Sequence, residues 1–168
     1  LLAHLILLRL VDRRPWSWVG LGREAARPAA LMRGLVIGAL AIGVPAGLLL
    51  VSRWLRVEDA AAGSWGRAAY GITVALAPAA MWEELTFRGY PFAVLHERFG
   101  AFVALAVTSV LFGLVHLQNP GAAPLPIAMV VVAGFLLGGV LLATGSLWAA
   151  WAAHFAWNWT MAALFHME

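Results

Sequence analysis

The chain has 168 residues, of which 63% are apolar and only 11% are charged. Soluble domains carry about 25% charged and about 45–50% apolar residues, so this composition excludes an ordinary soluble domain. The mean hydropathy of +0.87 agrees. At roughly 20 residues per crossing, the length allows about five to six spans. Because an open sheet cannot satisfy its backbone in lipid, we expect an all-α, polytopic transmembrane helix bundle that forms a single integral-membrane domain over residues 1–168.

The positive charge lies mostly before the first complete apolar span. All eleven basic residues are arginine, and six of them occur there: Arg9, Arg13, Arg14, Arg23, Arg27 and Arg33. A pI of 10.6 can indicate nucleic-acid binding, but here the charge flanks apolar segments and forms no stripe on a soluble fold. The positive-inside rule explains it and places residues 9–33 in the cytoplasm. We therefore expect a protein of the bacterial plasma membrane with no nucleic-acid partner.

The predicted elements follow in chain order. Leu1–Leu8 has the character of the tail of a truncated span, and because the chain opens with Leu1 and not Met, we expect further sequence before it. After the Arg-rich connection, spans are expected over residues 35–51, over an interrupted stretch from 68 to 100, and over 101–117, 127–143 and 146–165. The chain has no Cys, which excludes disulfides, thiolate zinc sites and cysteine nucleophiles.

Few polar residues interrupt the apolar segments. Glu83, Glu84 and Arg88 lie in an otherwise apolar stretch, whereas residues 100–167 contain no Asp, Glu, Lys or Arg. Apart from a few Ser, Thr and Gln and Asn119 in a Pro-Gly turn, the polar exceptions there are His116, His154, Asn158 and His166. A charge at the bilayer centre costs about 2.5–3.5 kcal/mol on insertion scales, so charges kept at that depth are usually paired and functional.

Helical spacing places these side chains on shared faces. Glu84 and Arg88 are four residues apart and can pair, and His154 and Asn158 have the same spacing. Suppose that the chain is helical over 78–98 and reverses near Gly100. Glu84 and His116 then lie sixteen residues on either side of the turn, each about 24 Å from it. The spacing therefore predicts that the polar side chains meet at one point inside the membrane.

Three short motifs carry a family resemblance. Residues 83–88, EELTFR, resemble the EExxxR motif of the CAAX protease and bacteriocin-processing (CPBP, or Abi) family of intramembrane endopeptidases. Phe112–His116 resembles the FxxxH motif of that family, and His154–Asn158 its HxxxN motif. The order and separation of the motifs fit as well, over about residues 78–160.

The resemblance implies peptide-bond hydrolysis with roles for single residues. Glu83 and His116 would hold and activate a water, and His154 and Asn158 would face the tetrahedral oxyanion. Arg88 would pair with Glu84 and hold the motif in place. The substrates implied are peptides or membrane proteins, prenylated ones included, with the lipid bilayer as the surrounding partner.

Several alternatives remain open at this stage. Glu83, His116 and His154 offer one oxygen and two nitrogens to zinc. The zinc-protease motif HExxH is absent, and we favour chemistry without a cofactor. A proton-coupled transporter would also keep charges inside a bundle, and a non-catalytic scaffold or immunity factor would keep the fold. The remaining histidines are expected at the interface, and the tryptophans of the last span in packing and anchoring: His4, His96, His166, Trp148, Trp151, Trp157 and Trp159.

Overall fold

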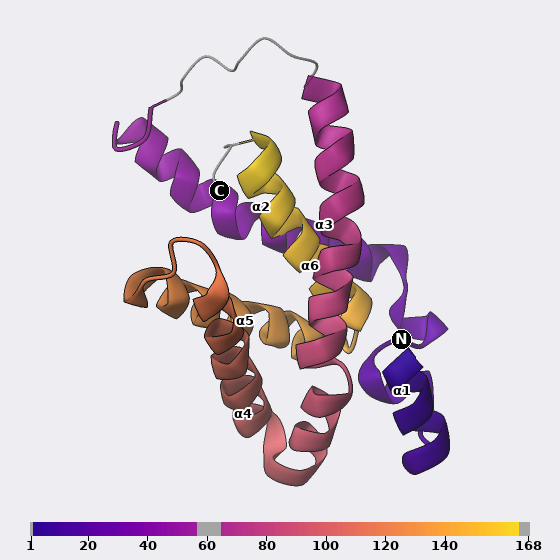
Figure 1. Cartoon of the computed structure of the whole chain (residues 1–168). Coiled ribbons are helices and arrows are strands. Elements are labelled where there is room, and N and C mark those ends of the chain that lie inside the picture. The colour runs from indigo at the N-terminus through magenta and orange to yellow at the C-terminus, as the bar shows by residue number, and fades with distance from the viewer. Residues whose placement is uncertain (1, 57–64, 165–168) are drawn as a thin grey trace.

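The computed structural model of the protein describes residues 2–56 and 65–164 (Figure 1). The structure is 86% helical, and no strand occurs in the described ranges, which confirms the all-α prediction. The α-helices are α1 (Leu2–Ile6), α2 (Pro28–Val51), α3 (Trp65–Arg88), α4 (Tyr90–Val115), α5 (Pro124–Thr144) and α6 (Leu147–Trp159). Short 3-10 or π segments complete the chain: η1 (Leu7–Val11), η2 (Trp16–Val19), η3 (Arg23–Ala25), η4 (His116–Gln118) and η5 (Thr160–Leu164). Residues 1, 57–64 and 165–168, with His166 among them, lie outside the described residues.

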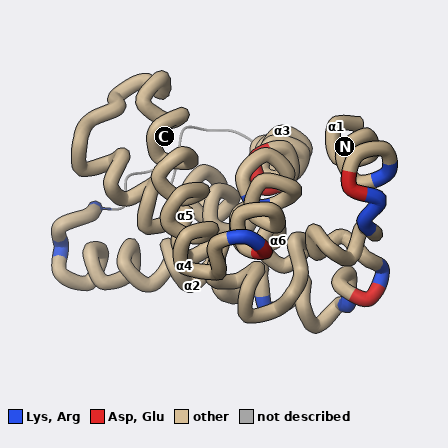
Figure 2. Tube along the Cα trace, turned by 90° about the horizontal axis from the view of Figure 1, so that it is seen from below, with Lys and Arg blue, Asp and Glu red and all other residues tan. Residues whose placement is uncertain are grey.

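The membrane character of the fold follows from three helical stretches. Pro28–Val51, Trp65–Gln118 and Pro124–Thr144 are long and apolar enough to cross a membrane. The expected number of five to six spans stays a prediction. Charged residues gather instead on the N-terminal segment (Figure 2). Helix α2 begins seven residues before the expected span, since Pro28 occupies its first turn, a position that proline favours.

Helix α6 lies at the centre of the bundle and contacts α2, α3 and α5. Its side chains at positions 149, 150, 152 and 153 are all alanine and almost completely buried. Such small residues let helix backbones approach closely. The helix begins because Ser146 caps it: the Ser146 Oγ accepts a hydrogen bond from Ala149 N. The same hydroxyl donates to the Ala25 carbonyl at 2.6 Å, which fixes the start of α6 in the bundle.

Tryptophan side chains join α6 to α3 in an antiparallel arrangement. Trp151 Nε1 donates to the Ala77 carbonyl at 2.8 Å, and Trp159 Nε1 donates to Thr73 Oγ1 at 3.0 Å. These bonds agree with the packing role expected for the tryptophans of the last span. They also set the depth of α6 against the carboxylates of α3.

Two glycines of α2 allow its close contact with α6. A methyl group at Gly34 would meet the carbonyl of Ala149, and one at Gly38 would meet the carbonyl of Ala153. A methyl group at Gly43 would meet nothing within 4 Å. The helix contains two glycine pairs with a spacing of four residues, Gly34/Gly38 and Gly43/Gly47, and only the first pair therefore forms a packing surface.

We expect Gly38→Ala to destabilise the protein by about 1–3 kcal/mol, the range for overpacking, because the new methyl group must displace the backbone beside His154. Gly43→Ala is the matched control. It replaces a helical glycine in open space and should leave stability unchanged or raise it by about 0.5–1 kcal/mol. Thermal unfolding in detergent measures both variants. Equal unfolding temperatures for the two would contradict the close contact of α2 and α6.

The path from α3 to α4 departs from the expected continuous helix. Helix α3 ends at Arg88, and Gly89 has non-helical angles of φ −77° and ψ −124°. Pro91 then lies in the first turn of α4, where its missing N–H removes no helical hydrogen bond. The expected reversal does occur at Gly100, with φ +84° and ψ 172° (Figure 1). The prediction of an unbroken helix over 78–98 was therefore wrong, whereas the turn was correct.

Candidate active site

The two adjacent carboxylates of α3 differ in burial and in their neighbours. Successive residues on a helix are turned by about 100°, so Glu83 and Glu84 leave α3 in different directions, although both reach the ring of His154. Glu84 is completely buried, and its Oε1 lies 2.8 Å from His154 Nδ1. Glu83 keeps 32% of its side chain exposed, and its Oε2 lies 3.9 Å from His116 Nε2. The carboxylate beside His116 is thus Glu83. The residue count from Gly100 had instead placed the neighbouring Glu84 at the depth of His116.

Arg88 completes a buried polar cluster around Glu84. Its Nη1 donates to Glu84 Oε1 at 3.2 Å, and its Nη2 donates to the Gly134 carbonyl at 3.2 Å. Both charged side chains have no exposed surface. The predicted pair of Glu84 and Arg88 is therefore confirmed as a contact. Since Glu84 Oε1 also contacts His154, the pair connects α3 with both α5 and α6.

The ring of Phe112 packs against the side chains of all three motifs. Its centroid lies 4.3 Å from the Arg88 guanidinium carbon, 4.6 Å from the His116 ring centroid and 5.8 Å from that of His154. Phe87 packs against its edge at 5.3 Å. A cation over an aromatic face is stabilising, the more so where both are desolvated. Phe112, the first residue of the FxxxH motif, therefore keeps the Arg88 guanidinium and both imidazoles in fixed relative positions.

His116 and His154 turn the same ring nitrogen toward Glu83. His116 Nδ1 lies 2.6 Å from the Phe112 carbonyl oxygen, and His154 Nδ1 is bonded to Glu84. A carbonyl and an ionised carboxylate only accept hydrogen bonds, so each Nδ1 carries the hydrogen and each neutral ring presents a lone pair at Nε2. The two Nε2 atoms lie 3.9 and 3.7 Å from Glu83 Oε2.

Three hydrogen-bond acceptor atoms lie close together at the Glu83 carboxylate: its own Oε2 and the Nε2 atoms of His116 and His154. Its Oε2 is buried and has no hydrogen-bond partner among the described residues. The lone pairs of the two imidazoles face the same oxygen. Acceptors this close repel one another unless a donor or a cation lies between them. Contacts beyond 3.5 Å between such atoms are commonly bridged by water, so the arrangement suits a water molecule or a shared proton.

Two cavities adjoin this point on different sides. A cavity of about 370 Å³ is lined by Glu83 and His116, together with Trp82, Thr86, Phe87, Val115 and Asn119. A smaller one of about 50 Å³ is lined by His154 and Asn158, together with Phe112, Ala133, Leu137 and Trp157. Asn158 shares this second cavity with His154, as their spacing predicts, and its side chain has no hydrogen bond to any described residue.

Some contributors to the site were missed at the sequence level. The Gly134 carbonyl, which accepts from Arg88, belongs to a backbone and leaves no side-chain signal. His4 was expected at the interface but is buried, and it accepts a hydrogen bond from Tyr90 N at 3.2 Å. A histidine outside every motif, 86 residues away from its partner in sequence, gives no pattern that could have indicated this contact.

The donors around Glu83 suit zinc in type, but they lie farther apart than the ligands of a tetrahedral zinc ion do. Tetrahedral zinc with bonds of about 2.0–2.1 Å keeps its ligand atoms about 3.3 Å apart, closer than the separations of 3.7 and 3.9 Å found here. Within residues 2–56 and 65–164, no group of three or more His, Asp and Glu side chains is arranged to hold a metal ion. A zinc site at Glu83, His116 and His154 stays an alternative prediction.

A helical membrane bundle that brings carboxylates and imidazoles to one point has the arrangement expected of an intramembrane hydrolase. The sequence model of one protein family, described as type II CAAX prenyl endopeptidase Rce1-like, matches residues 64–160. Because this match covers more than half of the chain, the protein belongs to that family, as the three motifs predicted. Neither the curated proteins nor the solved structures contain a match to the chain.

Proposed function

We propose that the protein is an intramembrane endopeptidase that hydrolyses peptide bonds with a water activated by Glu83. Membership of a family of endopeptidases supports the reaction class. The observation that carries the mechanism is the convergence of Glu83 Oε2 with the Nε2 atoms of His116 and His154. A water at this point donates one proton to the carboxylate and is oriented by an imidazole lone pair, as general-base catalysis requires.

The oxyanion of the tetrahedral intermediate needs donors on the opposite side of the scissile carbonyl. Asn158 offers its amide N–H groups to the cavity that it shares with His154. A His154 ring that enters the reaction protonated donates from Nε2, and the Glu84 carboxylate at Nδ1 then offsets the ring charge. Glu83 passes the proton taken from the water to the leaving amine as the C–N bond breaks, which restores the carboxylate. Arg88 keeps Glu84 in this position and does not itself contact the reacting atoms.

The larger cavity offers a place for the substrate chain. Trp82 and Phe87 line it beside Glu83 and His116, and Trp82 is 69% exposed. Aromatic walls around two catalytic groups suit a peptide that arrives with an apolar attachment. We therefore propose peptide or membrane-protein substrates, prenylated ones included. We further propose that residues 9–33 lie in the cytoplasm, on the arginine distribution, and that the membrane is the bacterial plasma membrane.

A zinc-dependent reaction is a second candidate, and one observation favours it. Metal-binding histidines commonly donate their other ring nitrogen to a carboxylate or a carbonyl, as both His116 and His154 do here. Zinc held by Glu83, His116 and His154 would supply a Lewis acid. No step of the proposed reaction depends on it.

Chelation separates the two candidates. The purified protein is reconstituted in liposomes with an internally quenched, membrane-tethered peptide that carries a prenylated cysteine. Glutamate chemistry predicts full cleavage activity after exhaustive treatment with EDTA and phenanthroline. Activity that is lost on chelation and regained with zinc would favour the zinc-dependent reaction over glutamate chemistry. No cleavage of this probe or of a set of unprenylated peptides by the untreated protein would contradict the proposed function itself.

A further inference from the structure

We propose that residues 2–20, called the N-terminal brace below, position the catalytic motifs by holding the break between α3 and α4 and the start of α6. This inference rests on the proposed function. The brace comprises α1, η1 and η2 and lies before the region matched by the family. It therefore adds to the site something that the three motifs do not contain.

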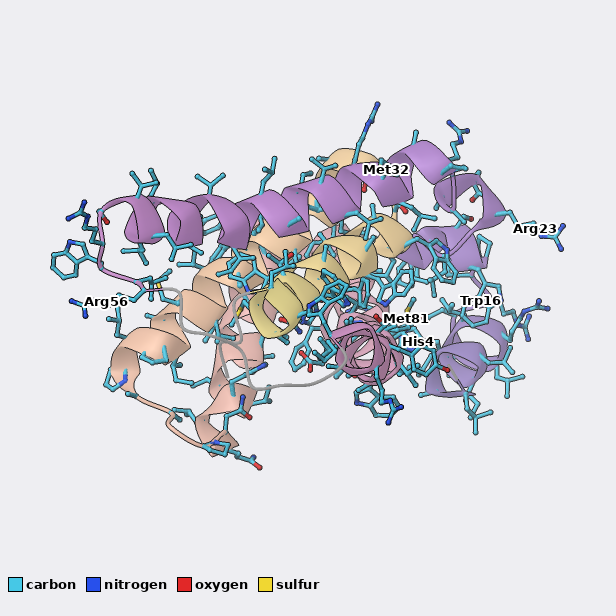
Figure 3. All side chains as sticks on the ribbon, turned by 90° about the horizontal axis from the view of Figure 1, so that it is seen from above. His4, Trp16, Arg23, Met32, Arg56 and Met81 are labelled. Atoms are coloured by element: carbon cyan, nitrogen blue, oxygen red, sulfur yellow. The ribbon has the colours of Figure 1, made fainter. Side chains whose placement is uncertain are left out.

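The first contact of the brace caps α4. The opening N–H groups of a helix have no acceptor within the helix, and the residue before α4, Gly89, offers no side chain for the purpose. His4, which is labelled in Figure 3, supplies the acceptor instead. Its Nε2 receives the hydrogen bond of Tyr90 N at 3.2 Å. A methyl group at Gly89 would meet this imidazole, so the glycine is needed for the approach. Arg88 lies two residues before the capped N–H.

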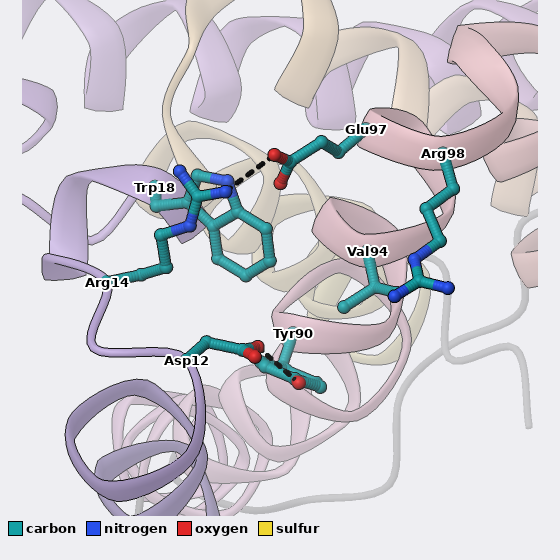
Figure 4. A pocket seen from close by; sticks show the side chains of 7 residues that line it. All are labelled: Asp12, Arg14, Trp18, Tyr90, Val94, Glu97 and Arg98. Atoms are coloured by element: carbon teal, nitrogen blue, oxygen red, sulfur yellow. Dashed lines mark hydrogen bonds and ion pairs between the residues drawn. The ribbon is translucent and has the colours of Figure 1, made fainter.

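Further contacts join the brace to the first turns of α4. The Tyr90 hydroxyl donates to Asp12 Oδ2 at 2.5 Å, and Arg14 Nη2 donates to Glu97 Oε1 at 2.6 Å (Figure 4). The Arg14 guanidinium also lies 5.3 Å from the ring centroid of Trp18. Exposed ion pairs contribute little each, so these contacts serve mainly to set the register of the brace along α4.

The end of the brace is anchored to α6. The Gly20 carbonyl accepts a hydrogen bond from Leu147 N at 2.9 Å, and Leu147 is the first residue of α6. Gly20 has φ +72°, and a Cβ there would collide with the same nitrogen, so only glycine suits the position. Leu8 and Val19 are buried at 1% and 2% exposure, which fixes the brace between its two ends.

The brace thus joins the start of α4, which follows the end of α3 after Gly89 alone, to the start of α6. Glu84 and Arg88 lie in the last two turns of α3 and His154 lies on α6, and the 2.8 Å hydrogen bond between Glu84 and His154 links these two helices directly. Residues 17–20 of the brace line a cavity of about 190 Å³ whose wall includes Arg88. Because catalytic groups tolerate only small displacements, loosening the brace is expected to lower turnover without abolishing the fold.

The test compares variants of one side chain in the full-length chain, reconstituted in lipid nanodiscs. His4→Leu keeps the bulk and removes the acceptor, whereas His4→Gln places an amide oxygen where Nε2 accepts. Arg9→Gln is the control, since Arg9 is an exposed residue of the brace without a polar contact to the described residues. Hydrogen exchange of peptides that cover Tyr90 measures the cap, and cleavage of the prenylated quenched peptide gives kcat and KM.

We expect His4→Leu to speed exchange at Tyr90 and to lower kcat by up to about 10²-fold, the scale of a misplacement by 1 Å, with KM little changed. His4→Gln should restore both values, and Arg9→Gln should match the wild type. Unchanged exchange in His4→Leu would overturn the cap, and faster exchange with unchanged kcat would overturn the positioning role. If the wild type does not cleave the probe, the proposed function fails, and the exchange measurement still tests the brace.

Discussion

Glu83→Gln is expected to lower turnover by about 10²–10⁴-fold, the contribution typical of a general base. The amide keeps the size of the side chain and fills the same place beside His116 and His154, so insertion and folding should survive. It cannot accept the proton of the attacking water. Cleavage of the membrane-tethered peptide, measured beside thermal unfolding in detergent, separates lost chemistry from lost structure.

Glu24→Gln is the matched control for this variant. Glu24 is exposed in η3 and lies apart from the three motifs, so its amidation should leave turnover at the wild-type level. If Glu83→Gln complements a deletion strain as well as the wild type does, the non-catalytic scaffold is the better interpretation. A proton-coupled transporter would be supported by proton-dependent uptake that Glu83→Gln abolishes in a chain without peptidase activity.

Arg88→Ala should destabilise the protein by about 3–5 kcal/mol, because it leaves Glu84 as a buried charge without its cationic partner. The Arg88 side chain is wholly buried and also fills the space between Phe112 and the Gly134 carbonyl. We therefore expect lower expression and a lower unfolding temperature in addition to lost cleavage. Thermal unfolding and the peptide assay are measured on the same preparation.

A double variant identifies the cause of this loss. Adding Glu84→Gln to Arg88→Met removes the stranded charge and keeps an amide for His154, so much of the stability should return. Turnover should stay low, since the amide holds the imidazole without offsetting its charge. Arg98→Ala, in contrast, removes an exposed arginine and should change stability by less than about 0.5 kcal/mol. A double variant no more stable than Arg88→Met alone would contradict the stranded charge as the cause.

The sequence alone indicated the candidate site, because few polar residues occur in the apolar helices. Burying a charge in lipid is costly, so Glu83, Glu84 and Arg88 indicate a functional site without any structure. The four-residue spacing of Glu84 and Arg88 predicts their contact, since a helix brings such side chains together. The reversal at Gly100 was predictable as well, and φ +84° explains why glycine occurs there.

Other features required the tertiary structure. A count of residues from Gly100 matched Glu84 with His116. The break at Gly89 and the turn of about 100° between neighbours on a helix instead leave Glu83 beside both imidazoles and Glu84 beside His154. The order of the motifs could not show that Phe112 packs on both imidazoles and on Arg88. Such contacts depend on the rotation of each helix about its axis, which packing against neighbouring helices decides.

The sequence by itself determined the helical membrane fold, the family and the set of candidate catalytic residues, because lipid permits only a few backbone arrangements and makes polar exceptions conspicuous. Only the tertiary structure decided which carboxylate meets which imidazole and which carbonyls complete the site. It alone showed His4 capping α4 from 86 residues away. Contacts between segments so distant depend on how the helices pack, and helix packing has no local sequence pattern.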